Sequence, residues 1–288
     1  MNLFDSLVDN ALNQQPQLGS LRVVVEKELL HHDILRAMSE AGLLQKLTFI
    51  GGTCLRTCYG SQRLSEDLDF SGGADFTREQ LVGMADYLRE VLQDKYGLDV
   101  EISEPTRDTG NVDTWKLKIQ TRPGRPDLPA QTINIDVCAI PSHLPQPRML
   151  LNPYGVDMGT MGLIVNAESR EEIFADKLVA FALRPNRLKH RDLWDIVWLH
   201  QAGIKPALEL LKNKLNDHQC TALDFNTAFA ERVSLLKNDP KLEAEFYKEM
   251  QRFLPVSQLK TVTQVGFWQF LNLLFQDLQQ QAASATSG

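Results

Sequence analysis

Cysteine is scarce in this chain of 288 residues, which contains only Cys54, Cys58, Cys138 and Cys220. Four scattered cysteines do not make a disulfide framework in a chain of this length. Cys54 and Cys58 are four residues apart and would share one helix face, but no second Cys or His pair accompanies them. We therefore interpret them as small buried apolar residues rather than as metal ligands.

Other absences narrow the class of protein. No stretch approaches the roughly 18–20 uncharged apolar residues of a membrane span, and the first twenty residues lack the basic and apolar regions of a signal peptide. These absences predict a cytoplasmic protein with no membrane partner. Basic residues are outnumbered, with 30 Lys and Arg against 37 Asp and Glu, which gives a net charge of −7. This balance argues against a bulk nucleic-acid coat protein but is compatible with a local basic groove.

The residue pattern predicts two parts. Hydrophobic residues make up 43% of the chain, enough to bury a core. Strand and helix patterns alternate up to about residue 160, and amphipathic helices follow. We therefore predict an α/β domain over 1–160, an α-helical domain over 161–280 and a flexible, low-complexity tail over 281–288.

The expected elements follow from hydrophobic periodicity and capping residues. In the first part, helices are expected at 21–41, 53–59 and 77–96, and strands at 46–50, 67–70, 98–103, 113–121 and 131–140. Residues 141–160 are rich in proline and are expected to be irregular. In the second part, helices are expected at 169–184, 190–202, 205–217, 225–237, 240–253 and 264–280. Thr77 with Gln80 and Ser169 with Glu172 are capping boxes at two of the helix starts.

A pair of carboxylates is the first chemical signal. Asp67 and Asp69 are two residues apart on a predicted strand, so both side chains project from one face. Two carboxylates this close repel each other unless a cation lies between them. Hard oxygen ligands at this spacing suit Mg²⁺. An isolated D-x-D pair is also common on a solvated strand face, so the surrounding sequence must distinguish a metal site from two solvent-exposed acids.

The surrounding sequence favours phosphate chemistry. Gly51, Gly52 and Thr53 follow a predicted strand and open a helix, and such a turn exposes backbone N–H groups at the positive helix end. Many purely structural turns have the same sequence. Asp136 lies on the polar face of the strand predicted at 131–140. Three strand-borne carboxylates beside a phosphate-binding turn are typical of a two-metal phosphoryl- or nucleotidyl-transfer site.

The run G-G-T-x-L-R-x-x-Y-G-x-x-R-x-S-E-D-L-D-F over 51–70 resembles the AbiEii/AbiGii-type toxins, including the MenT group. These toxins belong to the DNA polymerase β-like nucleotidyltransferase superfamily. Residues 169–199 resemble the later motifs of that family, a helix-borne Lys followed by an R-D-x-x-D helix. The resemblance covers about residues 45–200. It implies a polymerase β-like α/β (α+β) domain with a mixed sheet and a helical domain that completes the active-site cleft.

The resemblance also implies roles for individual residues. The nucleotide-binding residues would be Gly51, Gly52, Thr53, Ser65 and Lys177. The metal ligands for Mg²⁺ or Mn²⁺ would be Asp67, Asp69 and Asp136, where Asp136 is chosen by its strand pattern because no local motif marks it. The catalytic set would be Asp67, Asp69, Lys177 and Asp192, and Asp195 competes with Asp192 for the last motif position.

The cations near these motifs have more than one interpretation. Lys177 lies at the edge of an apolar helix stripe, where it can either reach into a cleft or extend into solvent. From that position we expect its removal to affect activity more than stability. Arg56 and Arg63 either serve the site or neutralise Glu66 and Asp67.

A basic stretch follows Lys177 in an otherwise acidic chain. It consists of Arg184, Arg187, Lys189, His190 and Arg191. These residues either grip an RNA phosphate backbone or provide favourable cations at the end of a helix. The sequence alone leaves these two interpretations open.

Together these features predict metal-dependent transfer of a nucleoside monophosphate from an NTP to an acceptor hydroxyl, with release of pyrophosphate. The resemblance implies the tRNA 3′ end as acceptor, inhibition of translation and growth, and a cognate antitoxin as partner. One alternative is a nucleotidyltransferase acting on a small molecule or a protein side chain. Another is a catalytically inactive module that binds a nucleotide or a partner.

Overall fold

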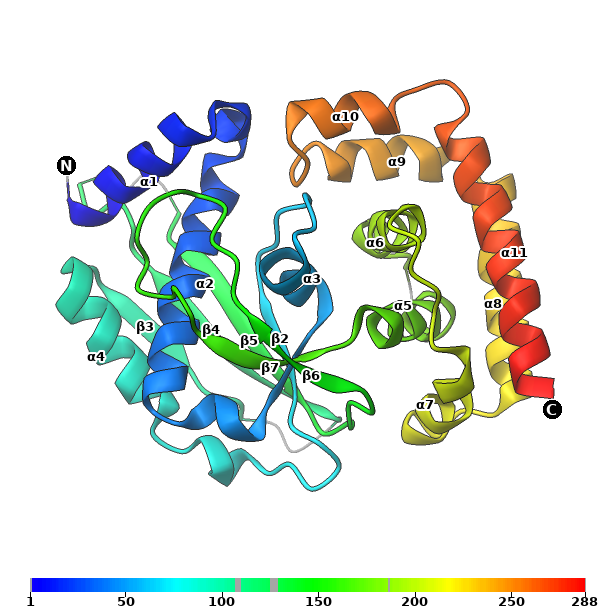
Figure 1. Ribbon diagram of the computed structural model, residues 1–288, viewed down its shortest axis with the longest axis horizontal. Coiled ribbons are helices and arrows are strands. Elements are labelled where there is room, and N and C mark those ends of the chain that lie inside the picture. The colour runs from blue at the N-terminus through cyan, green and yellow to red at the C-terminus, as the bar shows by residue number, and fades with distance from the viewer. Residues whose placement is uncertain (1, 107–109, 125–128, 186, 288) are drawn as a thin grey trace. The chain divides into compact units, whose positions relative to one another are not determined.

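The computed structural model describes residues 2–106, 110–124, 129–185 and 187–287. The chain divides into two compact units, Met1–Glu168 and Ser169–Gly288 (Figure 1). The sequence pattern placed the boundary near residue 160. The first unit extends further because β7 (Ile164–Glu168) pairs in parallel with β1 (Thr48–Ile50) and completes the sheet.

The first unit contains one seven-stranded mixed sheet with the order β3-β4-β5-β2-β1-β7-β6. The other strands are β2 (Leu68–Ser71), β3 (Val100–Ser103), β4 (Val112–Ile119), β5 (Gln131–Cys138) and β6 (Pro145–Met149). The helices are α1 (Leu3–Gln14), α2 (Arg22–Glu40), α3 (Gly51–Tyr59) and α4 (Met84–Tyr96), with 3₁₀ helices at Pro16–Leu21, Leu43–Lys46 and Arg78–Leu81. The predicted α/β class with a mixed sheet is confirmed.

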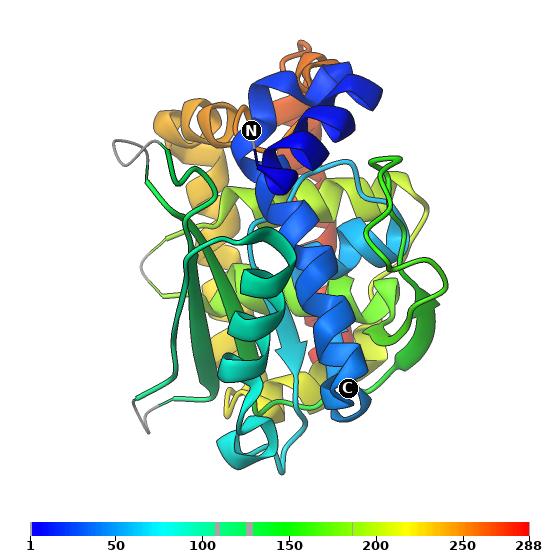
Figure 2. The same ribbon diagram turned by 90° about the vertical axis from the view of Figure 1, so that its left-hand side faces the viewer.

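One face of the sheet is apolar and the other is polar. Alternate residues of β4 and β5 are buried on the side covered by α2 and α4 (Figure 2): Trp115, Leu117, Ile119, Ile133, Ile135 and Val137. Because successive strand residues point to opposite faces, the residues between them lie on the other side. Those residues include Thr114, Lys116, Asn134 and Asp136. The apolar face forms the core, and the polar face is available for chemistry.

The structure differs from the expected elements at two places in this unit. The stretch 141–160 contains β6, which was not predicted because it carries Pro145 and Pro147. Proline is tolerated there because β6 is an edge strand. The helix expected over 77–96 is interrupted: a 3₁₀ turn ends near Leu81, and Gly83 with φ of 83° precedes α4. The side chain of Thr77 makes no capping hydrogen bond.

Among the described residues of the second unit, the regular elements are all helices, joined by loops and turns. Its helices are α5 (Arg170–Leu183), α6 (His190–Gln201), α7 (Leu211–Asp217), α8 (Ala222–Asn238), α9 (Pro240–Met250), α10 (Val256–Val262) and α11 (Phe267–Ser287), with a 3₁₀ turn at Leu208–Leu210. The predicted cap of α5 is confirmed, because Ser169 Oγ accepts a hydrogen bond from the backbone N–H of Glu172 at 3.1 Å. Helix α10 was not predicted.

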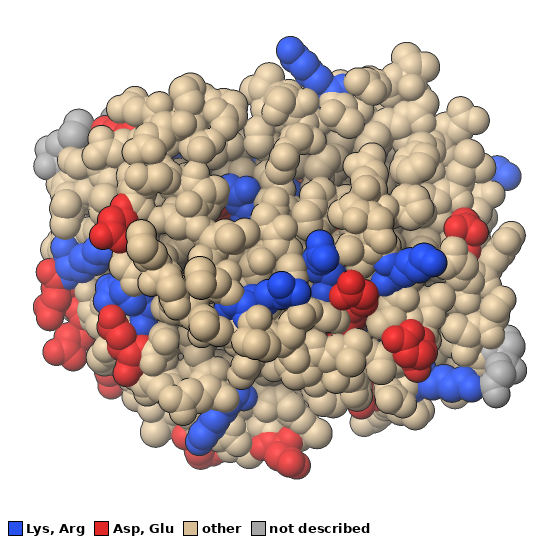
Figure 3. All heavy atoms as spheres, viewed as in Figure 1, with Lys and Arg blue, Asp and Glu red and all other residues tan. Residues whose placement is uncertain are grey.

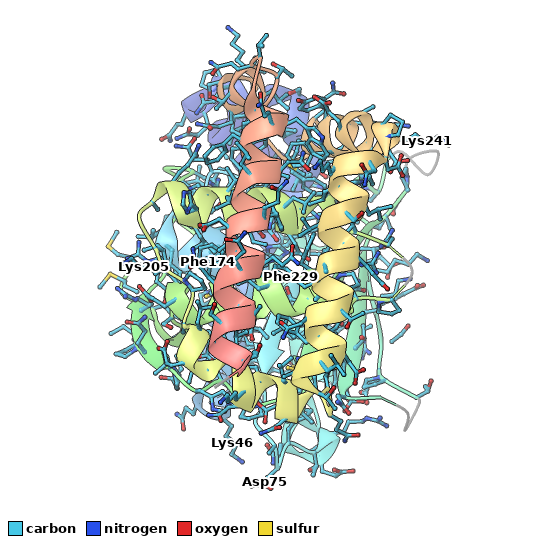
Figure 4. The ribbon with its side chains drawn as sticks, turned by 90° about the vertical axis from the view of Figure 1, so that its right-hand side faces the viewer. Lys46, Asp75, Phe174, Lys205, Phe229 and Lys241 are labelled. Atoms are coloured by element: carbon cyan, nitrogen blue, oxygen red, sulfur yellow. The ribbon has the colours of Figure 1, made fainter. Side chains whose placement is uncertain are left out.

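An aromatic cluster forms the core of this unit. The ring of Phe181 lies 5.1 Å from that of Phe229 and 4.6 Å from that of Phe275, and α8 and α11 run side by side (Figure 4). The tail expected over 281–288 is instead helical to Ser287, since α11 extends into it and Ala282 is buried. Among the described residues of both units, no helix is long and apolar enough to span a membrane.

Candidate active site

Three predicted carboxylates come together on the polar face of the sheet. Asp69 on β2 and Asp136 on β5 are register partners in neighbouring parallel strands, so both side chains leave the same face. Neighbouring strands are about 4.8 Å apart. Asp67 immediately precedes β2, and its Oδ1 accepts a hydrogen bond from the backbone N–H of Asn134 at 3.1 Å. All three carboxylates are partly exposed.

Asp136 has an orienting partner that the sequence did not reveal. The hydroxyl of Thr114 donates a hydrogen bond of 2.6 Å to Asp136 Oδ1, and the two residues are register partners in β4 and β5. Such a partner fixes the direction of the carboxylate. A threonine on the polar face of a strand has no local signature, and only the pairing of β4 with β5 identifies it.

The glycine turn lies directly beside these acids. Ile50, the last residue of β1, is the register partner of Asp69, and Gly51 follows it with φ of 76°. A Cβ atom at Gly51 would lie 2.7 Å from Asp69 Oδ2. Both the left-handed backbone and this close approach require glycine. As predicted, helix α3 begins immediately after the strand, and its N-terminus lies next to the carboxylates.

A buried guanidinium packs against the same turn. Arg63 is 3% exposed and donates from Nη1 to the carbonyl oxygen of Leu64 at 2.8 Å. Its Nη2 occupies the space that a side chain at Gly52 would need, so a larger residue there would displace the guanidinium. This arrangement places a cation at the N-terminal end of α3, where the backbone N–H groups already favour an anion.

Thr53 and Ser65 hold the acid-bearing segment in place. Thr53 is fully buried, and its hydroxyl lies 2.7 Å from Ser65 Oγ and contacts the carbonyl oxygen of Asp67. These contacts tie α3 to the segment that leads into β2. In this structure the Thr53 hydroxyl therefore positions Asp67, and its predicted contact with phosphate stays a prediction.

A buried carboxylate from α2 supports the same segment. Glu28 is 2% exposed and accepts hydrogen bonds from the backbone N–H of Ser65 at 2.7 Å, from Arg56 Nε at 3.0 Å and from the hydroxyl of Tyr154. Arg56 also donates to the carbonyl oxygen of Ser61 at 2.9 Å. Glu28 was not predicted, although an acid within the apolar pattern of 21–41 was a signal that could have identified it.

The sequence interpretation of Arg56 as a neutraliser of Glu66 or Asp67 is therefore wrong. Arg56 pairs with Glu28, which α2 brings from a distant part of the sequence. Glu66 is paired with Lys27 of the same helix at 3.0 Å. Which acid a given arginine meets depends on tertiary packing, so proximity in the sequence was misleading.

The remaining predicted residues form a separate cluster in the helical unit. Lys177 Nζ lies 2.5 Å from Asp192 Oδ1 and 2.9 Å from Asp195 Oδ2, and Arg184 Nη2 lies 3.1 Å from Asp192 Oδ2. Asp192 and Asp195 thus both bind Lys177. Lys177 itself is only 9% exposed. Its partners make it part of a buried ionic cluster rather than a lysine at an open rim.

The cluster keeps Asp192 ionised. Burial by itself raises the pKa of this carboxyl, but the cations Lys177, Lys189 and Arg184 outweigh burial and hold the pKa well below its usual range. The favourable interaction belongs to the ionised form. Asp192 therefore stabilises the helical unit at neutral pH and loses this contribution in acid.

The basic stretch is largely paired inside its own unit. Arg184 binds Asp192, and Arg191 Nε lies 3.4 Å from Glu249 Oε1 while its guanidinium lies 4.7 Å from the ring centre of Phe253. Arg187 is exposed. The structure thus favours the structural interpretation for Arg184 and Arg191, and Arg187 is the exposed arginine of the stretch.

The structure therefore presents the predicted residues as two groups. The first unit brings together the three acids, the glycine turn, Thr53 and Ser65. The second unit brings together Lys177, Asp192 and Asp195.

The chain is similar to proteins of a known family. The family described as "Nucleotidyl transferase AbiEii toxin, Type IV TA system" matches residues 33–275. Among solved structures, the nucleotidyltransferase toxin MenT4 from Mycobacterium tuberculosis H37Rv is similar, with a TM-score of 0.54, 15% identity, and coverage of 99% of this chain and 98% of that chain. JHP933 from Helicobacter pylori has a TM-score of 0.49, 17% identity, and coverage of 91% and 94% respectively. No curated protein matches the chain significantly.

The carboxylate cluster yields the first prediction. Asp67→Asn should lower nucleotidyl transfer by about three orders of magnitude, the scale expected when preorganised electrostatic stabilisation is lost. The fold should persist, because an amide oxygen can still accept the hydrogen bond from Asn134. Single-turnover rates with labelled NTP and circular dichroism measure the two effects. Asp94→Asn, which alters an exposed acid on α4, is the matched control. Full activity in Asp67→Asn would remove this residue from the site.

The lysine cluster yields a second prediction, which reverses the stability expectation from the sequence. Lys177→Ala leaves Asp192 and Asp195 buried without their shared cation, and breaking a buried ion pair in this way costs about 3–5 kcal/mol. Urea unfolding measures this loss. Lys205→Ala, at an exposed position of the same unit, should change the free energy of unfolding by less than about 0.5 kcal/mol. A Lys177→Ala protein as stable as the Lys205→Ala control contradicts the buried cluster.

The third prediction concerns acid stability. The depressed pKa of Asp192 means that its contribution is complete above the ordinary carboxyl pKa of about 3.9 and is lost as the pH falls further. Asp192→Asn should therefore reduce stability at pH 7 and flatten the fall in the urea midpoint as the pH drops from about 4 to about 2. Asp277→Asn, an exposed change on α11, is the control. An unchanged pH slope in Asp192→Asn would show that other acids control this transition.

Proposed function

Because this chain belongs to the AbiEii family of nucleotidyltransferase toxins from type IV toxin–antitoxin systems, we propose that it transfers a nucleoside monophosphate from an NTP to the 3′ end of an RNA, with tRNA as the acceptor. Nucleotidyltransferase activity, an NTP substrate and an antitoxin partner follow from the family itself. The acceptor, the metal and the roles of individual residues are the parts we propose. Modification of tRNA would stop translation and growth.

One observation carries the proposal: three carboxylates converge beside a glycine turn at the N-terminus of α3. Asp67, Asp69 and Asp136 offer only hard oxygen donors, and two of them are register partners on one sheet face. This donor set fits Mg²⁺ or Mn²⁺. These three residues would hold the metal, which would neutralise phosphate charge and align the reacting oxygens.

The residues of the first unit have complementary roles in this reaction. The backbone N–H groups that follow Gly51 and Gly52 bind the triphosphate at the N-terminus of α3, and Ser65 lies beside them. The acceptor hydroxyl oxygen forms a bond to the α-phosphorus while the bond from that phosphorus to pyrophosphate breaks. The hydroxyl proton passes to Asp136, which Thr114 holds in a fixed direction. Pyrophosphate leaves from the side of the glycine turn.

We also propose a role for the lysine of the cluster in the helical unit. We assign to Lys177 a contact with the nucleotide phosphates, as the family motifs imply. Asp192 and Asp195 fix the position of its ammonium group at 2.5 and 2.9 Å. A lysine held in this way loses little conformational entropy when it meets a phosphate, which favours a preorganised contact.

An RNA acceptor is compatible with the acidic charge of the chain. Figure 3 shows Lys and Arg side chains in small groups, several of them beside Asp or Glu. RNA binding would therefore rely on a few placed cations, among them the exposed Arg187. Each phosphate contact contributes to a measurable salt dependence.

The fourth prediction tests the reaction directly. The full chain is incubated with Mg²⁺, each labelled NTP in turn, and a mixture of total RNA, aminoglycosides and protein. We expect label on RNA of tRNA size, removal of the labelled nucleotide by 3′ exonuclease, and loss of labelling with EDTA and with Asp67→Asn. Labelling should weaken as salt rises, with a log–log slope of roughly −0.7 for each single-strand phosphate neutralised.

Each alternative outcome has a defined meaning. Label only on an aminoglycoside or on protein refutes the RNA acceptor and leaves the nucleotidyltransferase standing. Labelling that survives EDTA refutes the metal assignment. Label on no acceptor, with Mn²⁺ also tried, refutes transfer by this chain under these conditions and favours a binding module.

A further inference from the structure

The sheet order gives the carboxylate cluster two distinct sides. Asp69 lies on β2, in the middle. On one side follow β1 and the glycine turn into α3, and on the other side follow β5 with Asp136 and then β4. The turn and Asp136 therefore flank Asp69 in opposite directions across the strands.

This order places the two substrates of the proposed function, on which the following inference rests. In phosphoryl and nucleotidyl transfer, the attacking and leaving oxygens lie roughly in line through the phosphorus. If the turn at Gly51 and Gly52 binds the phosphates that leave, the attacking hydroxyl must come from the opposite side. That side is the polar face of β5 and β4.

The polar face of β4 is open at this position. Thr114, which bonds to Asp136, and Lys116, the next residue on the same face, are both exposed. Lys116 lies about 7 Å further along the strand and is the register partner of Asn134 on β5 and of Ser103 on β3. Lys116 therefore lies on the strand next to β5, on the side of β5 away from β2.

A hollow adjoins this lysine. It has a volume of about 330 Å³, and its lining includes Ser103, Glu104, Thr106, Thr114 and Lys116. Thr114 lines the hollow while its hydroxyl bonds to Asp136, so this residue connects the hollow to the carboxylate cluster. Its lining combines polar side chains with the apolar side chains of Pro105 and Val112, a mixture that can meet both the hydroxyl groups and the ring carbons of a ribose.

We propose that the outer face of β4, with Lys116 and the adjoining hollow, binds the end of the RNA acceptor. The terminal ribose presents its hydroxyl at Asp136, and Lys116 contacts the phosphate that precedes the terminal nucleotide. Glu104 lines the same hollow and opposes this phosphate electrostatically. Acceptor binding then depends on the placement of one cation rather than on a broad basic surface.

The test compares three variants of the full chain with labelled NTP and tRNA. Lys116→Gln should raise the KM for tRNA about five- to tenfold at low salt and make the salt slope shallower by about 0.7, while the KM for NTP stays unchanged. Glu104→Gln should have the opposite effect and lower the KM for tRNA, because it removes a negative charge beside the phosphate. Lys46→Gln removes an exposed cation before β1 (Figure 4), at the opposite end of that strand from the glycine turn, and should change neither constant.

The outcomes separate this inference from the function on which it rests. If tRNA is labelled in an Asp67-dependent manner but Lys116→Gln behaves like Lys46→Gln, the acceptor surface is wrong and the proposed function stands. Equal increases in the KM for NTP and for tRNA would also overturn the inference, because the triphosphate is bound on the other side. Labelling of a small molecule or a protein instead of RNA overturns both.

Discussion

The geometry of the first unit depends on one buried charge, the carboxylate of Glu28. A carboxylate removed from water is tolerated only when hydrogen-bond donors surround it. Glu28 has three: the guanidinium of Arg56, the hydroxyl of Tyr154 and the backbone N–H of Ser65. The last of these fixes the chain two residues before Asp67. The need to provide hydrogen bonds to buried Glu28 thereby fixes the position of the segment that leads to Asp67 and Asp69.

In the helical unit the buried charges at the centre are positive, and carboxylates surround them. Lys177 lies between Asp192 and Asp195, and Lys214, which is 2% exposed, lies 2.7 Å from Glu172 and 2.6 Å from Asp176. Each lysine pairs with two carboxylates of a neighbouring helix: Lys177 of α5 with two from α6, and Lys214 of α7 with two from α5. For Lys177 the consequence is that its proposed catalytic role cannot be separated from stability by removal of the side chain, because either function suffers when the charge is lost.

The polar face of the sheet links architecture to chemistry. Two-residue periodicity places Asp69, Asp136, Thr114 and Lys116 on one side of the sheet. Strand pairing sets the first three in a row across β2, β5 and β4, and Lys116 lies two residues beyond Thr114 on β4. The neighbours in this row come from three different strands, so the row depends on strand pairing rather than on proximity in the sequence. The proposed metal site and the orienting hydroxyl lie along this row, and the proposed acceptor contact lies beside it on β4.

The local features could be predicted from the residue pattern: the glycine turn after a strand, the Asp67–Asp69 pair, the Ser169 cap and most helices and strands, because each depends on residues close together in the chain. The pairings between distant residues follow from the folded structure. β6 was not predicted because only its position at the sheet edge makes its prolines acceptable. The contacts of Glu28 with Ser65 and of Thr114 with Asp136 join residues 37 and 22 positions apart, respectively. Periodicity cannot specify such partners, because they depend on which strands and helices meet.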